Sequence, residues 1–392
     1  MNADVAIVGG GLAGLAAARE LRAAGRSVVV FDKGRAAGGR CATRRNAPCT
    51  FDYGAQFFTV REPAFAAALA PFGDRLVQRW AGPFRTWQDG VLGPDPRPGE
   101  RYVAVPGMSA LPRAFAEPLG SAVQAGLRVE ALRRDGDGWW LSVRRLVDEV
   151  LFAYGPFGAL VLALPPPQAR ALLATAGSGG AASGSPSLGS LTAVATPNAG
   201  PPNAGPPNGG PPIVAPSNGG PPIVAPSNGG PLAYGQVAHK LDELMASLQP
   251  CLAAMVAFRE PVQGGDGALF VTDPVLGFAA HDGGKPGRAG APTYVLHGAA
   301  AWSQAQFDQP LEGSFDALLA AFAHVVGEPL PELVHRGMHR WRYALASPPP
   351  PGPAAVFDRD LQLAAAGDAF VGGRVEGAFL SGVAAAQLVL AG

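Results

Sequence analysis

Residues 5–14 read VAIVGGGLAG, an apolar run followed at once by a glycine-rich turn. The run is short and wholly apolar, as a strand buried within a parallel sheet requires. The turn fits the pattern G-x-G-x-x-G, and residues 12–24 continue with leucine, alanine, arginine and glutamate, which favour a helix. A second apolar run at residues 28–31 ends in Asp32. This order predicts a Rossmann-like unit that binds a dinucleotide.

Each glycine of the turn has its own expected role. Gly9 permits the tight turn, Gly11 lets the backbone approach a pyrophosphate, and Gly14 lets the helix pack closely on the strand. The free backbone amides of Leu12 and Ala13 and the partial positive charge at the start of the helix favour binding of the dinucleotide phosphates. The alternative is a glycine-rich turn that packs without a ligand.

A second glycine-rich loop follows the acidic residue. Asp32 lies 18 residues after the last glycine of the first turn, where its carboxylate is placed to accept hydrogen bonds from a ribose. Lys33, which comes next, is a further expected cofactor contact, and residues 34–40 read GRAAGGR. Gly39 allows close backbone approach, and Arg40 can neutralise a pyrophosphate from the far side. The alternative for Arg40 is a solvated surface charge.

Length and composition limit the classes of protein. The 392 residues suffice for two domains, and 48% are hydrophobic, which suits a folded core. Lysine and arginine together number 30, as do aspartate and glutamate. This balance gives no electrostatic reason to expect a nucleic acid or a membrane surface as partner.

The cysteines and the apolar segments bear on the compartment. Cys41, Cys49 and Cys251 form no C-x-x-C pair, and an odd number cannot all pair, so we expect a reducing compartment. The N-terminal residues lack the basic region of a signal peptide. No apolar stretch reaches the roughly 18 residues of a transmembrane helix. We therefore expect a cytoplasmic protein.

Two segments carry a resemblance to a known family. The GGR of residues 38–40 resembles a signature of the flavin amine oxidase superfamily, and DYGAQFFT at residues 52–59 resembles a segment of the renalases, which belong to it. The resemblance implies FAD as the cofactor. It also implies that Gly54, Ala55 and Gln56 lie against the isoalloxazine, with Gln56 able to bind the polar edge of the flavin or a substrate carboxamide.

The C-terminal region resembles the same family. Residues 363–368 read as a strand ending in Gly-Asp, and GRVEGAFLSG at residues 373–382 opens a helix whose start would face the flavin. Renalases usually carry Trp after the Gly-Asp, where this chain has Ala369. No cysteine lies in this motif to form a thioether, so FAD is expected to be non-covalent. The resemblance adds these expected cofactor contacts: Val129, Gly367, Asp368, Val375, Glu376, Gly377 and Ala378.

Two further segments suggest the substrate cavity. Residues 295–303 read VLHGAAAWS and residues 339–344 read HRWRYA, and both resemble renalase segments. They supply His297, Trp302 and His339, which join Gln56 as the expected catalytic residues; the alternative is that these aromatic residues are ordinary core. His335 and His339 stand four apart, but Gly337 weakens a helix there and no further ligand set is evident. No metal is expected.

The fold class expected is α/β, with a discontinuous Rossmann-like FAD-binding domain and an inserted substrate domain of mixed sheet and helices. We assign residues 1–60, 105–175 and 355–392 to the first, and residues 61–104 and 234–354 to the second. Residues 176–233 are low in complexity, and the decapeptide at 211–220 repeats identically at 221–230. With little to bury, this segment reads as a disordered or polyproline-like insert.

The renalase resemblance implies oxidation of isomeric dihydro-NAD(P), reduced at the 2 or 6 position, to NAD(P)+. Hydride would pass to flavin N5, and O2 would reoxidise the flavin with release of hydrogen peroxide. Because this oxidation leaves no proton to remove, no positioned general base is needed, and none stands out in the sequence. The alternatives are a flavin amine oxidase or desaturase of the same superfamily, or a flavin-binding protein without turnover.

Overall fold

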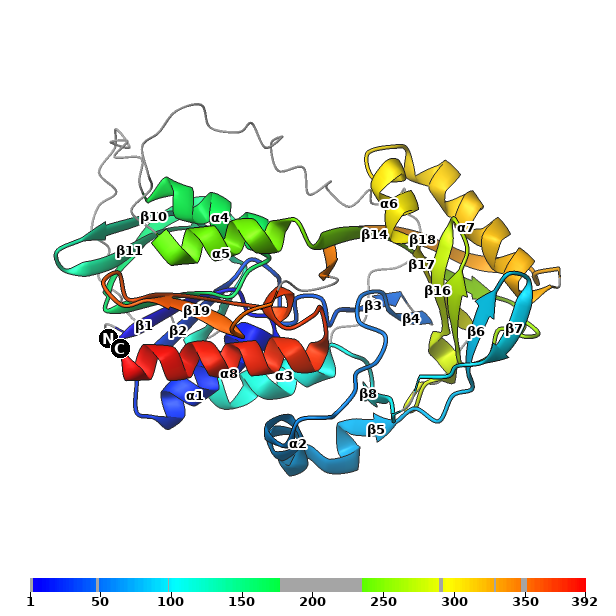
Figure 1. Cartoon of the computed structure of the whole chain (residues 1–392), viewed down its shortest axis with the longest axis horizontal. Coiled ribbons are helices and arrows are strands. Elements are labelled where there is room, and N and C mark those ends of the chain that lie inside the picture. The colour runs from blue at the N-terminus through cyan, green and yellow to red at the C-terminus, as the bar shows by residue number, and fades with distance from the viewer. Residues whose placement is uncertain are drawn as a thin grey trace.

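The structure is a computed structural model that describes residues 3–46, 49–97, 99–176, 235–288, 292–327, 329–346 and 351–392. A six-stranded sheet lies in one half of the molecule (Figure 1). Its central strands are parallel, and β19 pairs antiparallel at one edge. The strand order is β19 (Ala355–Asp358), β20 (Leu363–Ala366), β13 (Ala159–Leu162), β1 (Val5–Val8), β2 (Val28–Asp32) and β9 (Val123–Ala125).

Both faces of this sheet are covered, which explains why its strands are apolar throughout. In β1, Val5 and Ile7 pack on one face while Ala6 and Val8 pack on the other. The first face carries α1 (Leu12–Ala23), α3 (Ala110–Ala116) and α8 (Val375–Ala391). The second carries α4 (Pro166–Thr175), α5 (Gly235–Met245) and a three-stranded sheet of β10 (Leu127–Asp135), β11 (Gly138–Arg145) and β12 (Val150–Phe157).

A seven-stranded sheet forms the other half of the molecule (Figure 1). Its neighbours are antiparallel except for the parallel pair β15 and β6. Helices α6 (Ala300–Gln306) and α7 (Leu311–Val326) cover one of its faces. The order is β18 (Leu333–Ala346), β14 (Leu248–Phe258), β17 (Thr293–Gly298), β16 (Leu276–His281), β15 (Ala268–Thr272), β6 (Phe84–Gln88) and β7 (Val91–Pro94).

Short elements join the two halves. The hairpin of β3 (Thr43–Asn46) and β4 (Cys49–Asp52) lies between the two large sheets in Figure 1. Helix α2 (Pro63–Leu69) packs against α8, where Phe65 and Phe379 have ring centroids 5.1 Å apart. The remaining elements are β5 (Val77–Arg79), paired with β8 (Tyr102–Ala104), and the 3-10 turns η1 (Ala70–Arg75), η2 (Glu117–Ala122), η3 (Asp282–Gly284) and η4 (Asp368–Phe370).

The expected α/β class with a Rossmann-like domain and a second sheet is confirmed, and three local features differ. His335 and His339 lie on the strand β18, not on a helix. Residues 43–52 form a hairpin that no sequence pattern indicated. Helix α5 packs with α4 on the six-stranded sheet, although its residues were assigned to the substrate domain. The domain boundaries themselves stay a prediction, and the low-complexity segment lies outside the described residues.

Among the helices that the structure describes, none is both long enough and apolar enough to cross a membrane.

Candidate functional site

The first glycine turn follows β1 and opens α1. A methyl group at Gly9 (φ 111°) would lie 2.3 Å from the carbonyl oxygen of Ala163, and one at Gly14 would lie 2.0 Å from that of Gly9. Both positions therefore need glycine for the turn and for close packing. A methyl group at Gly11 would meet nothing within 4 Å. The backbone at Gly11 borders open space, as the approach of a ligand requires.

The start of α1 leaves backbone amides outside the helical ladder. The first intrahelical bond runs from Leu15 N–H to the carbonyl of Gly11 at 3.0 Å, so the amides of Leu12, Ala13 and Gly14 precede it. These amides carry the positive end of the helix dipole. The residues present fit the pyrophosphate of a dinucleotide, as the sequence predicts.

Asp32 links the two glycine-rich loops. Its Oδ2 accepts a hydrogen bond from Gly10 N–H at 2.6 Å, and its Oδ1 accepts one from Gly34 N–H, also at 2.6 Å. Gly38 N–H in turn donates to the carbonyl of Gly10 at 3.0 Å. Each carboxylate oxygen keeps a second lone pair, so Asp32 can still accept from a ribose while it orders both loops.

The second glycine-rich loop lies against the first, and Lys33 and Val129, two of the expected cofactor contacts, lie nearby. A methyl group at Gly39 (φ 55°) would lie 3.3 Å from Gly11 Cα, so the two loops touch. Burial lowers the pKa of Lys33, and nearby Arg128 lowers it further. Val129 is half-buried beside the six-stranded sheet, where the pairing of β10 with β11 shifts by one residue.

Arg40 is not a solvated surface charge, because it is bound on both sides. Its guanidinium forms an ion pair with Asp368 and donates to the carbonyls of Tyr343 at 3.1 Å and Ala344 at 3.4 Å. The side chains of Arg40 and Asp368 are 28% and 10% exposed. Arg40 therefore connects the second loop, the end of β18 and the C-terminal Gly-Asp. The neighbouring Cys41 is buried, and this burial raises the pKa of its thiol to about 12.

Helix α8 brings the C-terminal motif to the same edge. Its first intrahelical bond comes from Ala378 N–H to the carbonyl of Arg374, so the amides of Glu376 and Gly377 stand outside the ladder. At Gly382, a methyl group would lie 2.1 Å from the carbonyl oxygen of Ala13, so α1 and α8 pack backbone to backbone. Val375 is buried, as is Ala369, which stands where the renalases carry Trp.

The carboxylate of Glu376 is committed to the protein itself. Its Oε1 accepts hydrogen bonds from the backbone amides of Arg61 at 2.6 Å and Glu62 at 2.8 Å. The residue is 5% exposed. Its side chain holds the residues that lead into α2 and does not serve as a direct cofactor ligand. Only the backbone amide of Glu376 remains for contact with the cofactor. Gly367 N–H similarly donates to Ser381 Oγ at 2.8 Å, which ties β20 to α8.

The seven-stranded sheet presents a row of side chains toward the glycine-rich edge. Residues that lie directly opposite each other on paired strands point to the same face. His339 of β18 lies opposite Ala253 of β14, and Ala253 lies opposite His297 of β17. His297 lies opposite Phe278, and Phe278 opposite Phe270. We call this the inner face; the small Ala253 separates the two histidines.

Tyr53 joins this row from the segment that follows β4. Its ring stacks on Trp341 with centroids 5.2 Å apart and meets His339 edge-on at 4.9 Å. Its carbonyl accepts a hydrogen bond from Trp341 Nε1 at 2.8 Å. His297 and Phe278 have ring centroids 5.7 Å apart. We call Tyr53, Phe278, His297, His339 and Trp341 the aromatic wall.

Both histidines of the aromatic wall are neutral at physiological pH. Burial is the main cause that lowers the pKa of His297 to about 4. A hydrogen bond with the Tyr53 backbone raises this pKa, and the nearby Lys285 lowers it. Burial and the nearby Arg44 lower the pKa of His339 to about 4. The buried Nε2 of His297 has no hydrogen-bond partner within the described part of the chain. Its hydrogen-bonding capacity is therefore not used by the described groups of the protein itself.

Gly54 and Gln56 differ from the roles expected of them. A methyl group at Gly54 would lie 2.1 Å from the carbonyl oxygen of Arg40, so this glycine is needed for backbone packing. Ala55 N–H donates to the same carbonyl at 3.0 Å. The amide of Gln56 donates to the carbonyls of Asp52 and Gly54 and accepts from Lys285 Nζ at 3.0 Å. It turns into the protein, which favours a structural role over contact with substrate.

Trp302 does not join the other candidates. It packs with Ala254, Val256 and Leu296, whose neighbours in sequence point to the inner face, so it belongs to the opposite face beneath α7. A methyl group at Gly298 would lie 2.9 Å from its ring. The expected place of Trp302 in a substrate cavity is corrected by this packing, because Trp302 lies in α6, after the turn that follows β17, and not on the strand that carries His297.

Sequence reasoning missed the residues beneath the site. Asp282, Lys285 and Arg288 are buried and surround Asp52, but they carry no motif and lie far from it in the chain. Phe278 was missed as well. The two-residue alternation of β16 places it on the inner face, but only the pairing with β17 shows what it adjoins.

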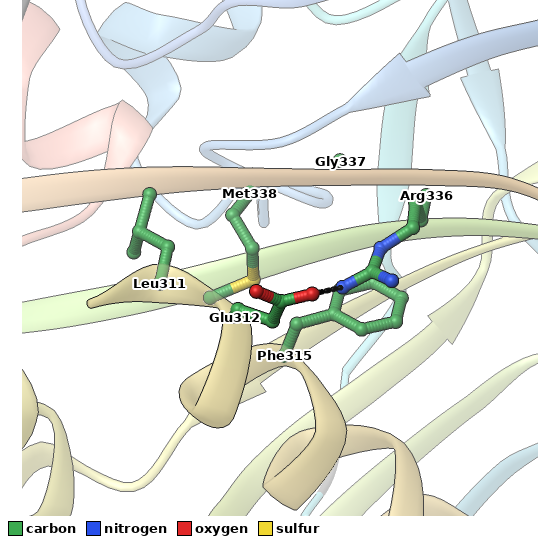
Figure 2. A pocket seen from close by; sticks show the side chains of 6 residues that line it. All are labelled: Leu311, Glu312, Phe315, Arg336, Gly337 and Met338. Carbon is green, nitrogen blue, oxygen red and sulfur yellow. Dashed lines mark ion pairs between the residues drawn. The ribbon is translucent and has the colours of Figure 1, made fainter. Parts of the chain in front are cut away.

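A shallow pocket of about 240 Å³ lies elsewhere (Figure 2). Figure 2 shows Arg336 and Met338 of β18 pointing toward Glu312 and Phe315 of α7, with the guanidinium of Arg336 4.0 Å from Glu312 Oε1. These residues alternate with His335, Gly337 and His339. The pocket is therefore on the α7 face and is separate from the aromatic wall.

Comparison with protein families identifies a Rossmann-like domain at the N-terminal end of the described fold. A model described as an NAD(P)-binding Rossmann-like domain matches residues 7–70. This range contains the first glycine turn, Asp32, the second glycine-rich loop and the 52–59 segment.

A Mycobacterium tuberculosis protein with the provisional name flavin-containing monoamine oxidase AofH is 37% identical over 94 residues. The match covers 22% of this chain and about a fifth of the length of that relative, 21%.

Solved structures match over the full length. Putrescine oxidase bound to putrescine has a TM-score of 0.64 at 14% identity, covering 100% of both chains. Cyclohexylamine oxidase from Brevibacterium oxydans has a TM-score of 0.62 at 13% identity, covering 99% of both. The chain therefore has the fold of the flavin-dependent amine oxidases, built on an NAD(P)-binding Rossmann-like domain.

Proposed function

We propose that this protein binds FAD non-covalently and is an oxidase of isomeric dihydro-NAD(P), the forms reduced at the 2 or 6 position. The observation that carries the proposal is the aromatic wall beside the glycine-rich edge. It joins His297 and His339, both neutral, to Tyr53 and Trp341. The motifs that resemble the renalases supply the substrate class.

The cofactor is supported by three glycine-rich segments that meet at one edge. Asp32 would hold the ribose, the amides at the start of α1 would hold the pyrophosphate, and the start of α8 would face the flavin. The similarity to the provisionally named monoamine oxidase AofH and the amine oxidase fold support FAD over a nicotinamide cofactor. When bound, FAD supplies a hydride acceptor that O2 reoxidises, with hydrogen peroxide as the reduced product.

The chain's own residues would orient the planar dihydronicotinamide ring of the substrate and exclude water from it. Oxidation of a dihydronicotinamide restores an aromatic ring and leaves no proton to remove, so the wall needs no ionised base. The carboxylates of Asp52 and Asp282 point into buried ion pairs away from the wall. His297 Nε2, an acceptor in the neutral ring when Nδ1 is protonated, can receive a hydrogen bond from a substrate carboxamide. Catalysis would then rest on orientation and cavity shape.

A second candidate is oxidation of an amine. The matched structures include oxidases of putrescine and cyclohexylamine, and stacked aromatic residues such as Tyr53 and Trp341 also suit a small amine. A neutral amine can give up hydride without a strong base, so the lack of an ionised base on the wall does not separate the two. Flavin binding without turnover is the third possibility, and a cytoplasmic location stays a prediction.

The test of the cofactor is direct. The purified protein should be yellow, and acid or heat should release FAD into the supernatant while the precipitate becomes colourless. After reduction, exposure to air should restore the oxidised spectrum with one hydrogen peroxide formed for each FAD. Colourless protein that cannot be reconstituted with FAD would contradict the proposal, and flavin retained on the precipitate would contradict non-covalent binding.

A further inference from the structure

Four acidic and basic side chains lie buried directly beneath the segment that carries Tyr53. We call Asp52, Asp282, Lys285 and Arg288 the buried charge cluster. The side chains of the first three have no exposed surface, and that of Arg288 is 4% exposed. Two cations and two carboxylates leave the cluster neutral overall, which limits the cost of burying it.

The contacts of the cluster bridge the two halves of the molecule. Lys285 Nζ lies 2.7 Å from Asp282 Oδ1 and 3.6 Å from Asp52 Oδ2. Arg288 forms an ion pair with Asp52 and donates to the carbonyl of Pro106. Asp52 Oδ1 also accepts from Thr43 Oγ1 at 2.6 Å and from Met108 N–H at 2.9 Å. Burial raises the pKa of Asp52 and nearby Asp282 raises it further, while Lys285 and Arg288 oppose both effects.

Residues 52–56 lie between this cluster and the aromatic wall. On the cluster side, Asp52 N–H donates to Asp282 Oδ2 at 3.3 Å, and Gln56 Oε1 accepts from Lys285 Nζ at 3.0 Å. On the wall side, the Tyr53 carbonyl accepts from Trp341 Nε1, and the Tyr53 backbone is hydrogen-bonded to His297. Any displacement of the segment would therefore move the ring of Tyr53 and the partner of His297 together.

Lys285 is the group that connects the cluster to both ends of this segment. It binds the side chain of Gln56 and pairs with Asp282, which binds the amide of Asp52. We propose that Lys285 is a positioning residue, whose ammonium fixes residues 52–56 against His297 and Trp341 and so sets the orientation of a ring bound on the aromatic wall. This role in turnover rests on the function proposed above, but the role in fixing the segment does not.

The test uses a charge-neutral pair of substitutions. Lys285→Met alone would leave two buried carboxylates facing one cation, which is strongly destabilising. The double variant D282N/K285M removes one charge of each sign and leaves the Asp52–Arg288 ion pair in place. A second variant, Gln56→Met, keeps all four cluster residues and breaks the link to Lys285, together with the hydrogen bonds from the Gln56 amide to the carbonyls of Asp52 and Gly54. It serves if the double variant does not fold.

Tyr294→Phe is the matched control. Tyr294 is fully buried in β17 of the same sheet, and its hydroxyl accepts from Val262 N–H at 2.9 Å. It packs with Val256 and Phe322 on the α7 face, away from the aromatic wall. This variant therefore loses a buried hydrogen bond of similar kind without touching residues 52–56.

The first readout is amide hydrogen exchange in the flavin-free protein, which needs no activity. The D282N/K285M protein should lose about tenfold or more of the protection of peptides spanning residues 52–58, while strands of the six-stranded sheet keep theirs. Gln56→Met should do so to a smaller degree, and Tyr294→Phe should leave these peptides unchanged. The proposal would be overturned if D282N/K285M and Gln56→Met both kept the wild-type protection of these peptides, or if Tyr294→Phe lost as much protection as they do.

The second readout is anaerobic reduction of the FAD-loaded protein by a 2- or 6-dihydro-NAD(P) isomer. In D282N/K285M and Gln56→Met the limiting rate of flavin reduction should fall about tenfold to a hundredfold, the penalty typical of misplaced reactants. The apparent dissociation constant of the substrate should change less. FAD content should stay that of the wild type. Lost protection with an unchanged limiting rate would refute the positioning role in catalysis. If the wild type itself is not reduced, the proposed function fails, and hydrogen exchange alone decides the role of Lys285 in fixing the segment.

Discussion

The carboxylate of Asp32 does two things at once. It binds Gly10 N–H and Gly34 N–H, one from each glycine-rich loop, before any ligand is present. The same oxygens are placed to accept from a ribose. A substitution here should therefore weaken cofactor binding through the lost contact and through loosening of both loops.

We expect Asp32→Ala to weaken FAD binding by about 1.5–3 kcal/mol, the range for hydrogen bonds to a charged group. Titration of the flavin-free protein with FAD, followed by flavin fluorescence, measures this. Asp4→Ala is the control, because Asp4 also accepts a backbone bond, from Ser27 N–H at 2.9 Å, before β1 and away from the loops. An affinity for FAD equal to that of the wild type would remove Asp32 from the site.

His297 predicts a pH dependence of stability. Its pKa of about 4 in the folded protein lies below the ordinary value of 6.5, so the unfolded chain binds more protons between these values. The free energy of unfolding should therefore decrease as the pH falls from about 6.5 toward 4, with a contribution from this residue of up to about 3 kcal/mol. Above pH 6.5 the contribution is complete.

Urea unfolding between pH 7.5 and 4.5 checks this dependence. His297→Gln should flatten the decrease, whereas His239→Gln should leave it unchanged, because the side chain of His239 is 77% exposed. A His297→Gln protein with the full wild-type pH dependence would show that this imidazole is not held neutral by burial.

At the scale of elements, the alternation of a strand decides which residues meet. His335 and His339 stand four apart, which fits one face of a helix as well as one face of a strand. The structure has them on β18, where four residues apart again means the same face. The pairing of β18 with β14, and of β14 with β17, then brings His339 and His297 to one wall.

The sequence could predict the first βαβ unit, the C-terminal helix and both glycine-rich loops. In these regions local signals such as glycine spacing and apolar periodicity determine the structure. It could not predict that Trp302 faces away from His297, since that depends on the turn into α6. Nor could it place Lys285 beside Asp52, because a contact between residues 233 positions apart leaves no local pattern.

The two faces of the seven-stranded sheet predict different effects of two tryptophan substitutions. Trp302→Phe removes packing beneath α7 and should lower the free energy of unfolding by about 1–2 kcal/mol, with little effect on the rate of flavin reduction. Trp341→Phe removes the hydrogen bond to Tyr53 and should slow reduction more than it lowers stability. Denaturant unfolding and anaerobic stopped-flow measure the two effects. If Trp302→Phe slowed flavin reduction and Trp341→Phe mainly lowered stability, Trp302 would belong to the site.

At the scale of the whole molecule, short elements join the two large sheets, and a low-complexity segment separates α4 from α5 in the sequence. The helices before and after that segment, α4 and α5, pack together, and Arg170 Nε lies 3.0 Å from Asp242 Oδ1 across them. Because this packing joins the flanking elements directly, we expect the fold not to need the sequence of the segment between them.

Replacing residues 197–231 with a short Gly/Ser linker should leave FAD content and turnover within about twofold, which corresponds to about 0.4 kcal/mol. Loop-closure entropy changes by only about 0.6 kcal/mol per doubling of length, so shortening is tolerated. Flavin absorbance per protein and steady-state oxygen consumption check this. A variant that folds with full FAD but loses most of its turnover would give the segment a role in the reaction.

The most direct test of the proposed function is anaerobic stopped-flow reduction of the FAD-loaded protein by matched donors. The 2- and 6-dihydro isomers of NAD(P)H should bleach the flavin much faster than ordinary 4-dihydro NAD(P)H, putrescine or cyclohexylamine, each at a saturating concentration. Air should then restore the oxidised spectrum with hydrogen peroxide formed. Faster bleaching by an amine than by either isomer would contradict the assignment and identify the protein as an amine oxidase.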